Sequence, residues 1–225
     1  MRLTLLADVH ANLPALEAVL RDPRGRGERV VCAGDMVGYY PWPNEVLDLL
    51  RSHRADCVRG DHKRGLLGRV DITWFHDDAA TALAWTRERL TAESLDYLAS
   101  LEDRRRFRAG DRLVAVHHGS PGEDDEYVMP EHLSSGLLVA AEADIVFLGH
   151  THHPMVGRYP DGLVVNPGSV GQPRDGDPRA SYATIDTEAL TAEVRRVPYD
   201  VEAVADRVRE VRLPQGLANR LREGR

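Results

Sequence analysis

Apolar runs alternate with stretches of helical periodicity over the first part of the chain. The run at residues 2–7 is followed by apolar residues at helical spacing, Leu13, Leu16, Val19 and Leu20. A second run at residues 30–33 precedes a helix that we expect to begin after Asn44. Asn12 and Pro14 suit the N-cap and the first turn of the earlier helix. The pattern therefore predicts strand, polar loop and helix, twice in succession.

The rest of the chain continues this alternation and then turns to strands. Helices are predicted at residues 78–90 and 91–101, and Val201, Val204 and Val208 mark a last helix capped by Asp200. Alternating elements followed by strands favour an α/β layered sandwich over a purely parallel sheet. The further predicted strands are, in order, residues 57–59, 112–116, 143–148, 163–165, 180–186 and 193–197.

The length and the absence of repeats predict one domain over residues 1–225. The chain has 225 residues, and domains average roughly 150 residues. The stretch rich in proline and glycine at residues 166–178 is too short for a linker between domains, so it is interpreted as an ordered functional loop or a crossover.

Composition excludes several classes of protein. Apolar residues make up 42% and charged residues 29%, which argues against wholesale disorder. The chain has 36 Asp and Glu residues against 29 Lys and Arg residues. This acidic balance disfavours a protein whose main function is to bind nucleic acid. The apolar run at residues 3–7 is too short for a membrane segment or a signal peptide. With Cys32 and Cys57 interpreted as reduced thiols, we expect a cytoplasmic location.

Imidazoles and carboxylates gather at the carboxyl ends of the predicted strands. Open α/β sheets bind ligands at that edge, so these side chains are expected to meet in one crevice. Taken singly, each has a structural interpretation, such as a satisfied core histidine or a turn aspartate. The ordered set indicates a site, and its members are Asp8, His10, Asp35, Asp61, His118, His150 and His152.

Such a cluster requires cations. Three carboxylates brought together repel one another and would have to be protonated or neutralised. The set is too large for one tetrahedral ion and suits two ions about 3.5 to 4 Å apart that share a carboxylate, an arrangement that serves phosphoryl transfer. All donors are nitrogen or oxygen, which favours two divalent transition-metal ions, chosen from Mn, Fe, Zn, Ni or Co.

The order of the motifs resembles the calcineurin-like metallophosphoesterase superfamily over nearly the whole chain. Segments at residues 8–12, 34–39 and 166–174 resemble its small single-domain bacterial and archaeal branch, which is phosphodiesterase-like. The resemblance implies a four-layer α/β sandwich, with two mixed β-sheets packed face to face and flanked by helices. The motifs are Asp8-x-His10, Gly34-Asp35, Gly60-Asp61-His62, His118-Gly119 and Gly149-His150-x-His152.

The resemblance also implies a role for each residue. His62 would lie beside the leaving group and, when protonated, would donate a proton to the departing oxygen. His118 is favoured over His117 because family members carry histidine immediately before this glycine, and neighbours on a strand point in opposite directions. One metal would be held by Asp8, His10 and His152 and the other by Asp61, His118 and His150, with Asp35 bridging the two.

Asp61 departs from the family pattern, which has asparagine at this position. An aspartate oxygen can still coordinate a metal, but the charge changes. Two divalent ions contribute +4, three carboxylates −3 and a bridging hydroxide −1, which leaves 0 where asparagine would leave +1. The attraction for an anionic phosphate is then weaker. We therefore expect a preference for a phosphodiester, with one negative charge, over a dianionic monoester.

Other polar and aromatic residues are weaker candidates. Asn166, Ser169 and Arg174 are candidate substrate contacts, since arginine suits bidentate phosphate binding, although their loop could serve only to close the sheet. The aromatic segment at residues 39–42 could line a pocket for a ring, but a packed loop is favoured. The acidic run at residues 123–126 is interpreted as a solvated loop, and the arginine run at residues 104–108 as a solvated strand flank.

Together these features predict a dinuclear-metal-dependent phosphoesterase. It would hydrolyse a small phosphodiester or nucleotide-like substrate by in-line attack of a metal-bridging hydroxide. Relatives leave open a dinucleoside polyphosphate hydrolase or a protein phosphatase. An alternative from another class is a metal-binding regulatory protein with weakened catalysis. The presence of His62 argues against this alternative. The expected partner is a small-molecule phosphate ester and not a membrane. Nucleic acid is disfavoured as a partner, and the sequence leaves the oligomeric state open.

Overall fold

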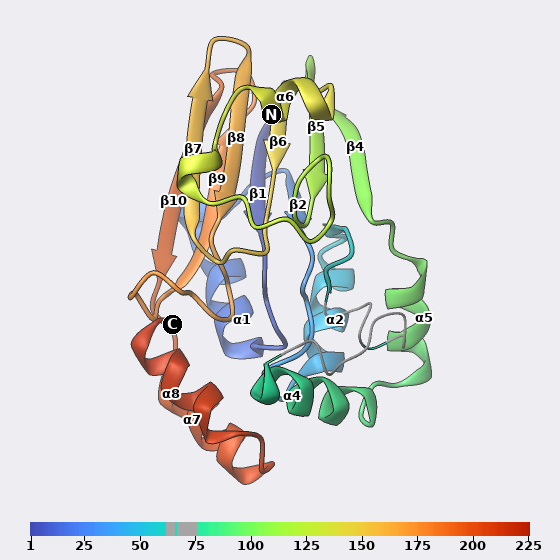
Figure 1. The fold of residues 1–225 in the computed structure, drawn as a ribbon, viewed down its shortest axis with the longest axis vertical. Helices are drawn as coiled ribbons and strands as arrows, with labels where there is room; N and C mark the ends of the chain where they lie inside the picture. Colours follow the sequence, from blue (N-terminus) through green and yellow to red (C-terminus); the bar gives the residue numbers. More distant parts are fainter. Residues whose placement is uncertain (62–65, 67–75) are drawn as a thin grey trace.

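Two five-stranded β-sheets packed face to face form the body of the molecule (Figure 1). The computed structural model describes residues 1–61, 66 and 76–225. In the first sheet β1 and β3 flank β2 in parallel, whereas β9 runs antiparallel to both β1 and β10. Its strands, in sheet order, are β10 (Thr191–Val197), β9 (Ala180–Asp186), β1 (Arg2–Leu6), β2 (Arg29–Cys32) and β3 (Asp56–Cys57).

The second sheet is also mixed. Its central strands β5, β6 and β8 are parallel, and the two edge strands β4 and β7 are antiparallel to their neighbours. The order is β4 (Arg104–Ala109), β5 (Arg112–His117), β6 (Ile145–Phe147), β8 (Gly162–Pro167) and β7 (Pro154–Tyr159).

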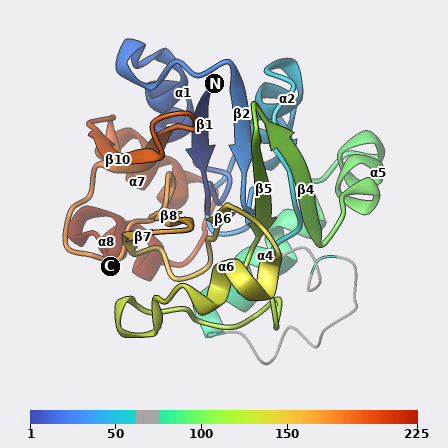
Figure 2. The same cartoon turned by 90° about the horizontal axis from the view of Figure 1, so that it is seen from above.

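Helices cover the outer faces of both sheets and complete four layers (Figure 2). Helices α1 (Leu13–Arg21), α2 (Pro43–Ser52) and α5 (Ala92–Ser100) pack on the first sheet, and α6 (Gly136–Ala141) packs on the second. Short 3-10 turns lie at η1 (Pro23–Gly25) and η3 (Pro130–His132). The fold class predicted from the sequence is confirmed.

A separate apolar cluster lies at one end of the sheets. There α4 (Asp77–Arg87), α7 (Val201–Glu210) and α8 (Gln215–Glu223) pack around Tyr40, which is fully buried. Figure 1 shows α7 and α8 next to each other at the lower left, below the strands in that view. Tyr40, in the aromatic segment at residues 39–42, therefore contributes to packing. This agrees with the packed loop that the sequence favoured over a pocket wall.

Alternate side chains on the strands serve different cores. On β1, Leu5 lies between the sheets and Leu6 packs against the helices. On β6, Phe147 lies between the sheets and Val146 packs against α6. Both faces of these strands are buried, which explains why their sequences are continuous apolar runs rather than an alternating pattern.

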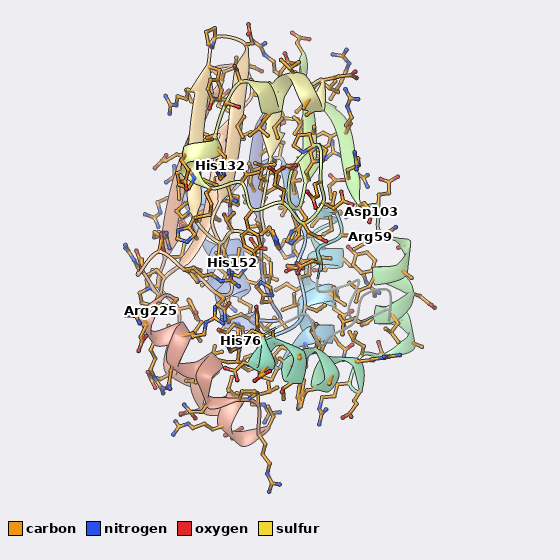
Figure 3. All side chains as sticks on the ribbon, in the orientation of Figure 1. Arg59, His76, Asp103, His132, His152 and Arg225 are labelled. Atoms are coloured by element: carbon orange, nitrogen blue, oxygen red, sulfur yellow. The ribbon has the colours of Figure 1, made fainter. Side chains whose placement is uncertain are left out.

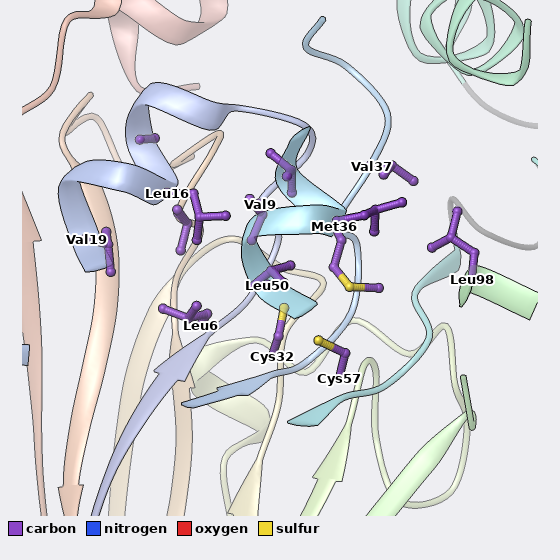
Figure 4. Packing of buried hydrophobic residues seen from close by; sticks show 14 of the residues in the cluster. Leu6, Val9, Leu16, Val19, Cys32, Met36, Val37, Leu50, Cys57 and Leu98 are labelled. Atoms are coloured by element: carbon purple, nitrogen blue, oxygen red, sulfur yellow. The ribbon is translucent and has the colours of Figure 1, made fainter. Parts of the chain in front are cut away.

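The core beneath α1 and α2 contains both cysteines (Figure 4). Cys32 on β2 and Cys57 on β3 are paired in register across the parallel strands, and both are buried free thiols. Each precedes a loop that carries an acidic residue of the candidate site, Asp35 or Asp61.

Most predicted helices and strands are present, and two predicted N-cap residues accept the expected hydrogen bonds. Asn12 accepts a hydrogen bond from the backbone N–H of Ala15 at 3.2 Å, and Asp200 accepts one from Ala203 at 2.9 Å. Strand β7 and helices α6 and α8 were not predicted from the sequence. The arginine run read as a strand flank is itself the edge strand β4. Within the described residues, no helix combines the length and apolar character needed to cross a bilayer.

Asp22 links α1 to the first sheet and provides a test of the fold. Its buried carboxylate accepts hydrogen bonds from Tyr182 Oη at 2.8 Å and from the backbone and guanidinium of Arg24. The hydrogen bonds from Arg24 dominate and lower the pKa of Asp22 from 3.8 to about 2. The stabilisation from this carboxylate is therefore fully present above pH 3.8 and is lost as the pH falls through about 2.

We expect Asp22→Asn to lower the free energy of unfolding by about 1 to 3 kcal/mol at pH 7, because it weakens several buried hydrogen bonds. The difference from wild type should shrink as the pH falls toward the pKa of Asp22. Urea denaturation at several pH values measures both effects. Glu17→Gln is the matched control, since Glu17 pairs with Arg21 on the surface of the same helix and should cost at most about 0.5 kcal/mol. Equal losses in the two variants would contradict the assignment.

Candidate metal centre

All seven residues singled out as ligands lie in the segments that directly follow strands. Asp8 and His10 follow β1, Asp35 follows β2, and Asp61 follows β3. The second sheet contributes the loops after β5 and β6, which carry the three remaining histidines. Figure 3 labels one of these, His152, which lies in the interior near the lower ends of the strands in that view. The carboxyl ends of both sheets thus supply one centre.

The ligand atoms of these residues form three overlapping groups, each with its members' atoms within 4.8 Å of one another. Asp8 and Asp35 are almost completely buried, as are the four histidines, and the side chain of Asp61 is 20% exposed. The groups are Asp8 with His10 and His152, Asp61 with His118 and His150, and Asp8 with Asp35 and His118.

Distances within the centre place Asp35 between the first two groups. Its Oδ2 atom lies 3.8 Å from His10 Nε2 and 3.6 Å from His118 Nε2. On one side His10 Nε2 lies 3.0 Å from His152 Nε2, and on the other His118 Nε2 lies 3.0 Å from Asp61 Oδ1. The arrangement gives two sets of donors that share one carboxylate.

Backbone carbonyls orient two of the imidazoles. His118 Nδ1 lies 2.7 Å from the carbonyl oxygen of Ala33, and His152 Nδ1 lies 2.5 Å from that of Gln172. A carbonyl can only accept, so each Nδ1 donates, and in the neutral form of each ring Nε2 presents a lone pair toward the centre. Contacts of this kind fix the tautomer and the ring orientation of metal-binding histidines.

The backbone of the centre is unusual for residues with side chains. Five ligand residues have a positive φ, a conformation that costs about 1 kcal/mol or more for each. Hydrogen bonds between loops hold it in place: the N–H of His10 donates to the carbonyl of Asp35 at 2.8 Å, and the N–H of His150 donates to the Asp8 carboxylate at 3.0 Å. The φ values are 52° at Asp8, 49° at His10, 44° at Asp35, 69° at His150 and 61° at His152.

Two motif glycines make room for the ligands. Gly34 has a φ of 93°, and a Cβ there would lie 2.6 Å from His118 Nδ1. A Cβ on Gly60 would lie 1.9 Å from Asp35 Oδ1 and 2.4 Å from the Asp35 nitrogen. The glycines that precede Asp35 and Asp61 in the sequence are therefore required by the close approach of the next loop.

Burial and mutual repulsion perturb the acids of the centre. Burial raises the pKa of Asp8 to about 6. Burial, followed by the charge of Asp61, raises the pKa of Asp35 well above its usual range. Burial alone would lower the pKa of His118, but the neighbouring carboxylates, led by Asp35, raise it to about 10. The centre thus requires bound positive charge to remain fully ionised.

The three predicted substrate contacts occupy different surroundings. Asn166 is fully buried, and its Nδ2 donates to the carbonyl of Gly149 at 2.7 Å and to Thr151 Oγ1 at 3.1 Å. Ser169 is also fully buried and donates to the carbonyl of Asp8 at 2.6 Å. Both side chains therefore support ligand loops. Arg174 is only partly buried and approaches Tyr39 Oη at 3.4 Å.

Two further histidines were considered in the sequence, His62 and His117. His62, the predicted proton donor, lies outside the described residues. His117 belongs to none of the three ligand groups in the described chain, and its ring nitrogens have no hydrogen-bond partner there. Burial lowers the pKa of His117 to about 4. His118, by contrast, belongs to two of the three groups.

The donor set fits a pair of divalent transition-metal ions. It offers carboxylate oxygens and imidazole nitrogens without thiolate, which suits first-row metals. The buried, mutually repelling carboxylates supply the negative charge that such ions neutralise. The Asp35 carboxylate lies between the two groups of donors, and segments from both sheets position these groups.

Comparison with known proteins identifies the family. The profile of the calcineurin-like phosphoesterase superfamily domain matches residues 1–190. The chain belongs to this superfamily. It is accordingly a metal-dependent phosphoester hydrolase, as its sequence motifs predict.

Individual relatives are similar over most or all of their length. MJ0912 of Methanocaldococcus jannaschii, an uncharacterized protein, is 34% identical over 241 residues that cover 99% of this chain and 98% of that one. Phosphodiesterase YfcE of Escherichia coli K12 is 27% identical over 202 residues, which cover 85% and 90%. The crystal structure of a metallophosphoesterase from Sphaerobacter thermophilus superimposes with a TM-score of 0.86 at 37% identity and covers 100% of both chains.

Two residues that contact the candidate ligands were not predicted from the sequence. Gln172 orients His152 through its backbone carbonyl, a contact that any residue type could make. The ring of Tyr127 packs on that of His150 with centroids 4.0 Å apart. Tyr127 directly follows the acidic run at residues 123–126, and no spacing rule places this loop over His150. The two residues therefore left no signal in the sequence.

The close approach at Gly60 can be tested by substitution. We expect Gly60→Ala to displace the Asp35 carboxylate and to weaken metal binding by about 100-fold, the upper range for residues that support metal ligands. Metal retained after dialysis, measured by elemental analysis, and the thermal midpoint report the effect. Gly122→Ala is the matched control, because a Cβ there meets its nearest neighbour, Ser120 Oγ, at 3.7 Å. Wild-type metal retention in Gly60→Ala would contradict the steric argument.

Proposed function

We propose that the chain is a dinuclear-metal-dependent phosphodiesterase acting on a small phosphodiester or nucleotide-like ester. The observation that carries this proposal is the position of Asp35, with Oδ2 within 4 Å of an imidazole nitrogen from each ligand group. A carboxylate shared in this way suits a pair of metal ions. The metals would be two divalent ions drawn from Mn, Fe, Zn, Ni or Co.

The proposed ligand sets follow the geometric groups. Both ions would share Asp35, and each set contains at least one residue from each sheet, so the sheets must pack correctly for metal to bind. The first ion takes Asp8, His10 and His152, and the second takes Asp61, His118 and His150.

The residues of the chain position the substrate and move its protons. Two divalent ions, when bound, would lower the pKa of a water molecule and offset the charge on the phosphate oxygens. His118 and His152 keep their Nε2 atoms aimed at the centre through their carbonyl contacts. His62, in its protonated form, donates to the leaving oxygen. This division of roles requires no covalent bond between the protein and the phosphoryl group.

Asp61 makes a diester the preferred substrate. Its Oδ1 atom lies 3.0 Å from His118 Nε2 and 3.5 Å from His150 Nδ1, so its charge lies within the second ligand group. The extra negative charge lowers the attraction for anions, and the loss is larger for a dianion than for a monoanion. A monoester, dianionic at neutral pH, is disfavoured relative to a diester.

The first test is metal-dependent turnover. The protein should hydrolyse bis-p-nitrophenyl phosphate with added Mn²⁺, lose this activity after chelation and dialysis, and regain it when Mn²⁺ is returned. Asp35→Asn should lower kcat/KM by more than about 100-fold. Asp48→Asn, at an exposed position on α2, is the control and should match wild type. Absence of turnover with each of the five metals, or turnover indifferent to chelation, would overturn the proposed function.

The second test addresses substrate charge. Asp61→Asn should shift the ratio of kcat/KM for bis-p-nitrophenyl phosphate over p-nitrophenyl phosphate toward the monoester by about tenfold or more. Asp111→Asn makes the same change in charge in the exposed turn after β4 and should leave the ratio unchanged. A ratio that does not respond to Asp61→Asn would remove the electrostatic basis of the diester preference.

A further inference from the structure

An exposed aromatic ring lies directly beside the metal centre. The ring of Tyr127 packs on that of the ligand His150, with centroids 4.0 Å apart and an angle of 44° between the planes. Even so, 52% of Tyr127 is exposed, an unusual value for a large apolar side chain in this protein. One part of the ring therefore covers a ligand while the rest remains accessible at the edge of the centre.

A guanidinium group without a carboxylate partner lies next to this ring. Arg174 Nη2 approaches Tyr39 Oη at 3.4 Å and Gln172 Oε1 at 3.5 Å, both long contacts to neutral groups. Its Nε atom is buried and has no hydrogen-bond partner among the described residues. The guanidinium also interacts with the Tyr127 hydroxyl and, through space, with the charge of Asp8.

Other arginines near this loop are paired differently. Arg179 forms a 2.6 Å ion pair with Asp177, and Arg196 pairs with Asp175. Arg174 forms no such pair with a carboxylate in the part of the chain that the structure describes. A guanidinium that is partly removed from water is stabilised when an anion pairs with it. The contrast with Arg179 and Arg196 leaves Arg174 available, among the described residues, to pair with a bound anion.

We propose that Tyr127 and Arg174 form a recognition subsite for a phosphodiester that carries a planar aromatic group, such as an aryl or nucleoside ester. Arg174 pairs with a non-bridging phosphate oxygen, and the planar group stacks on the accessible part of the Tyr127 ring. This inference rests on the proposed function and narrows its substrate class. Tyr127 and Arg174 act in binding and orientation, not in proton transfer.

The charge of Arg174 complements that of Asp61. Asp61 lowers the net charge of the loaded centre by one unit compared with asparagine, and Arg174 adds one positive charge beside it. A substrate with a single negative charge balances this set, whereas a dianion leaves an excess. The charge of Arg174 strengthens binding of either anion, and the preference for the monoanion comes from Asp61.

The test uses binding as well as turnover. The probes are the monomethyl esters of phenylphosphonic and ethylphosphonic acid, which are monoanionic and differ in the planar group. Calorimetric titration of the Mn²⁺-loaded protein should show the phenyl probe binding about tenfold more tightly than the ethyl probe. Tyr127→Ala should abolish this difference and leave the ethyl probe unchanged. Tyr127→Phe should retain it, because the ring is kept.

Arg174 is tested with the same probes. Arg174→Gln should weaken both by a similar factor of about tenfold or more, since it removes a charge-assisted hydrogen bond to the group they share. Arg174→Lys should recover part of the affinity. Val139→Ala, at a side chain of α6 that is 77% exposed, is the control and should match wild type with both probes.

The outcomes separate this subsite from the proposed function. Equal binding of the two probes by wild type, or equal weakening of both by Tyr127→Ala, would overturn the aromatic subsite even if phosphodiesters are hydrolysed. Unchanged binding in Arg174→Gln would overturn the role of Arg174. A ring preference without hydrolysis of any phosphodiester would support the subsite and reject the phosphodiesterase activity.

Discussion

The burial of negative charge at the edge where the two sheets meet is the constraint on which the rest of the structure depends. Asp8 and Asp35 are shielded from water, and Asp61 adds a third carboxylate within reach of the same imidazoles. Burial raises the pKa values of Asp8 and Asp35, so full ionisation requires cations at the centre. Packing the strands of β1 to β3 against those of β5 and β6 brings the acids of one sheet to the histidines of the other. Formation of the site and packing of the sheets are therefore one event.

Hydrogen bonds between backbone groups, and between side chains and the backbone, connect the loops that hold these groups. The carbonyl of Asp8 accepts from both Ser169 Oγ and the N–H of Gly171, and its carboxylate accepts from the N–H of His150. Asn166 ties the loop after β8 to that after β6. Because each ligand loop is fixed by another, the left-handed conformations of the ligand residues persist despite their cost. The same network orders the loop that carries Arg174.

The positions of the ligands could be predicted because strands end in a recognisable way, with an apolar run followed by glycine, aspartate or histidine. The strands missed were those whose residues argue against a strand. The residues of β4 have tertiary partners: Arg105 pairs with Asp56 at 2.9 Å, and the ring of Phe107 lies 3.8 Å from the guanidinium of Arg29 on β2. In β7 a proline opens an edge strand, where it interrupts no ladder. Helix α8 carried a readable signal in Leu217, Ala218 and Leu221, which the sequence analysis did not use.

Recognition of the substrate is less accessible to sequence reasoning than metal binding, because it depends on which charges remain unpaired after folding. The net charge of −7 argues against polyanions as partners, but it says nothing about the field at one crevice. That field depends on a single carboxylate, Asp61, and on whether a nearby arginine is already paired. Arg174 and Arg179 lie in the same loop, and the sequence does not distinguish them. The structure shows that Arg179 forms an ion pair with a carboxylate. The three-dimensional pairing of charges therefore carries information about specificity that composition and motif cannot supply.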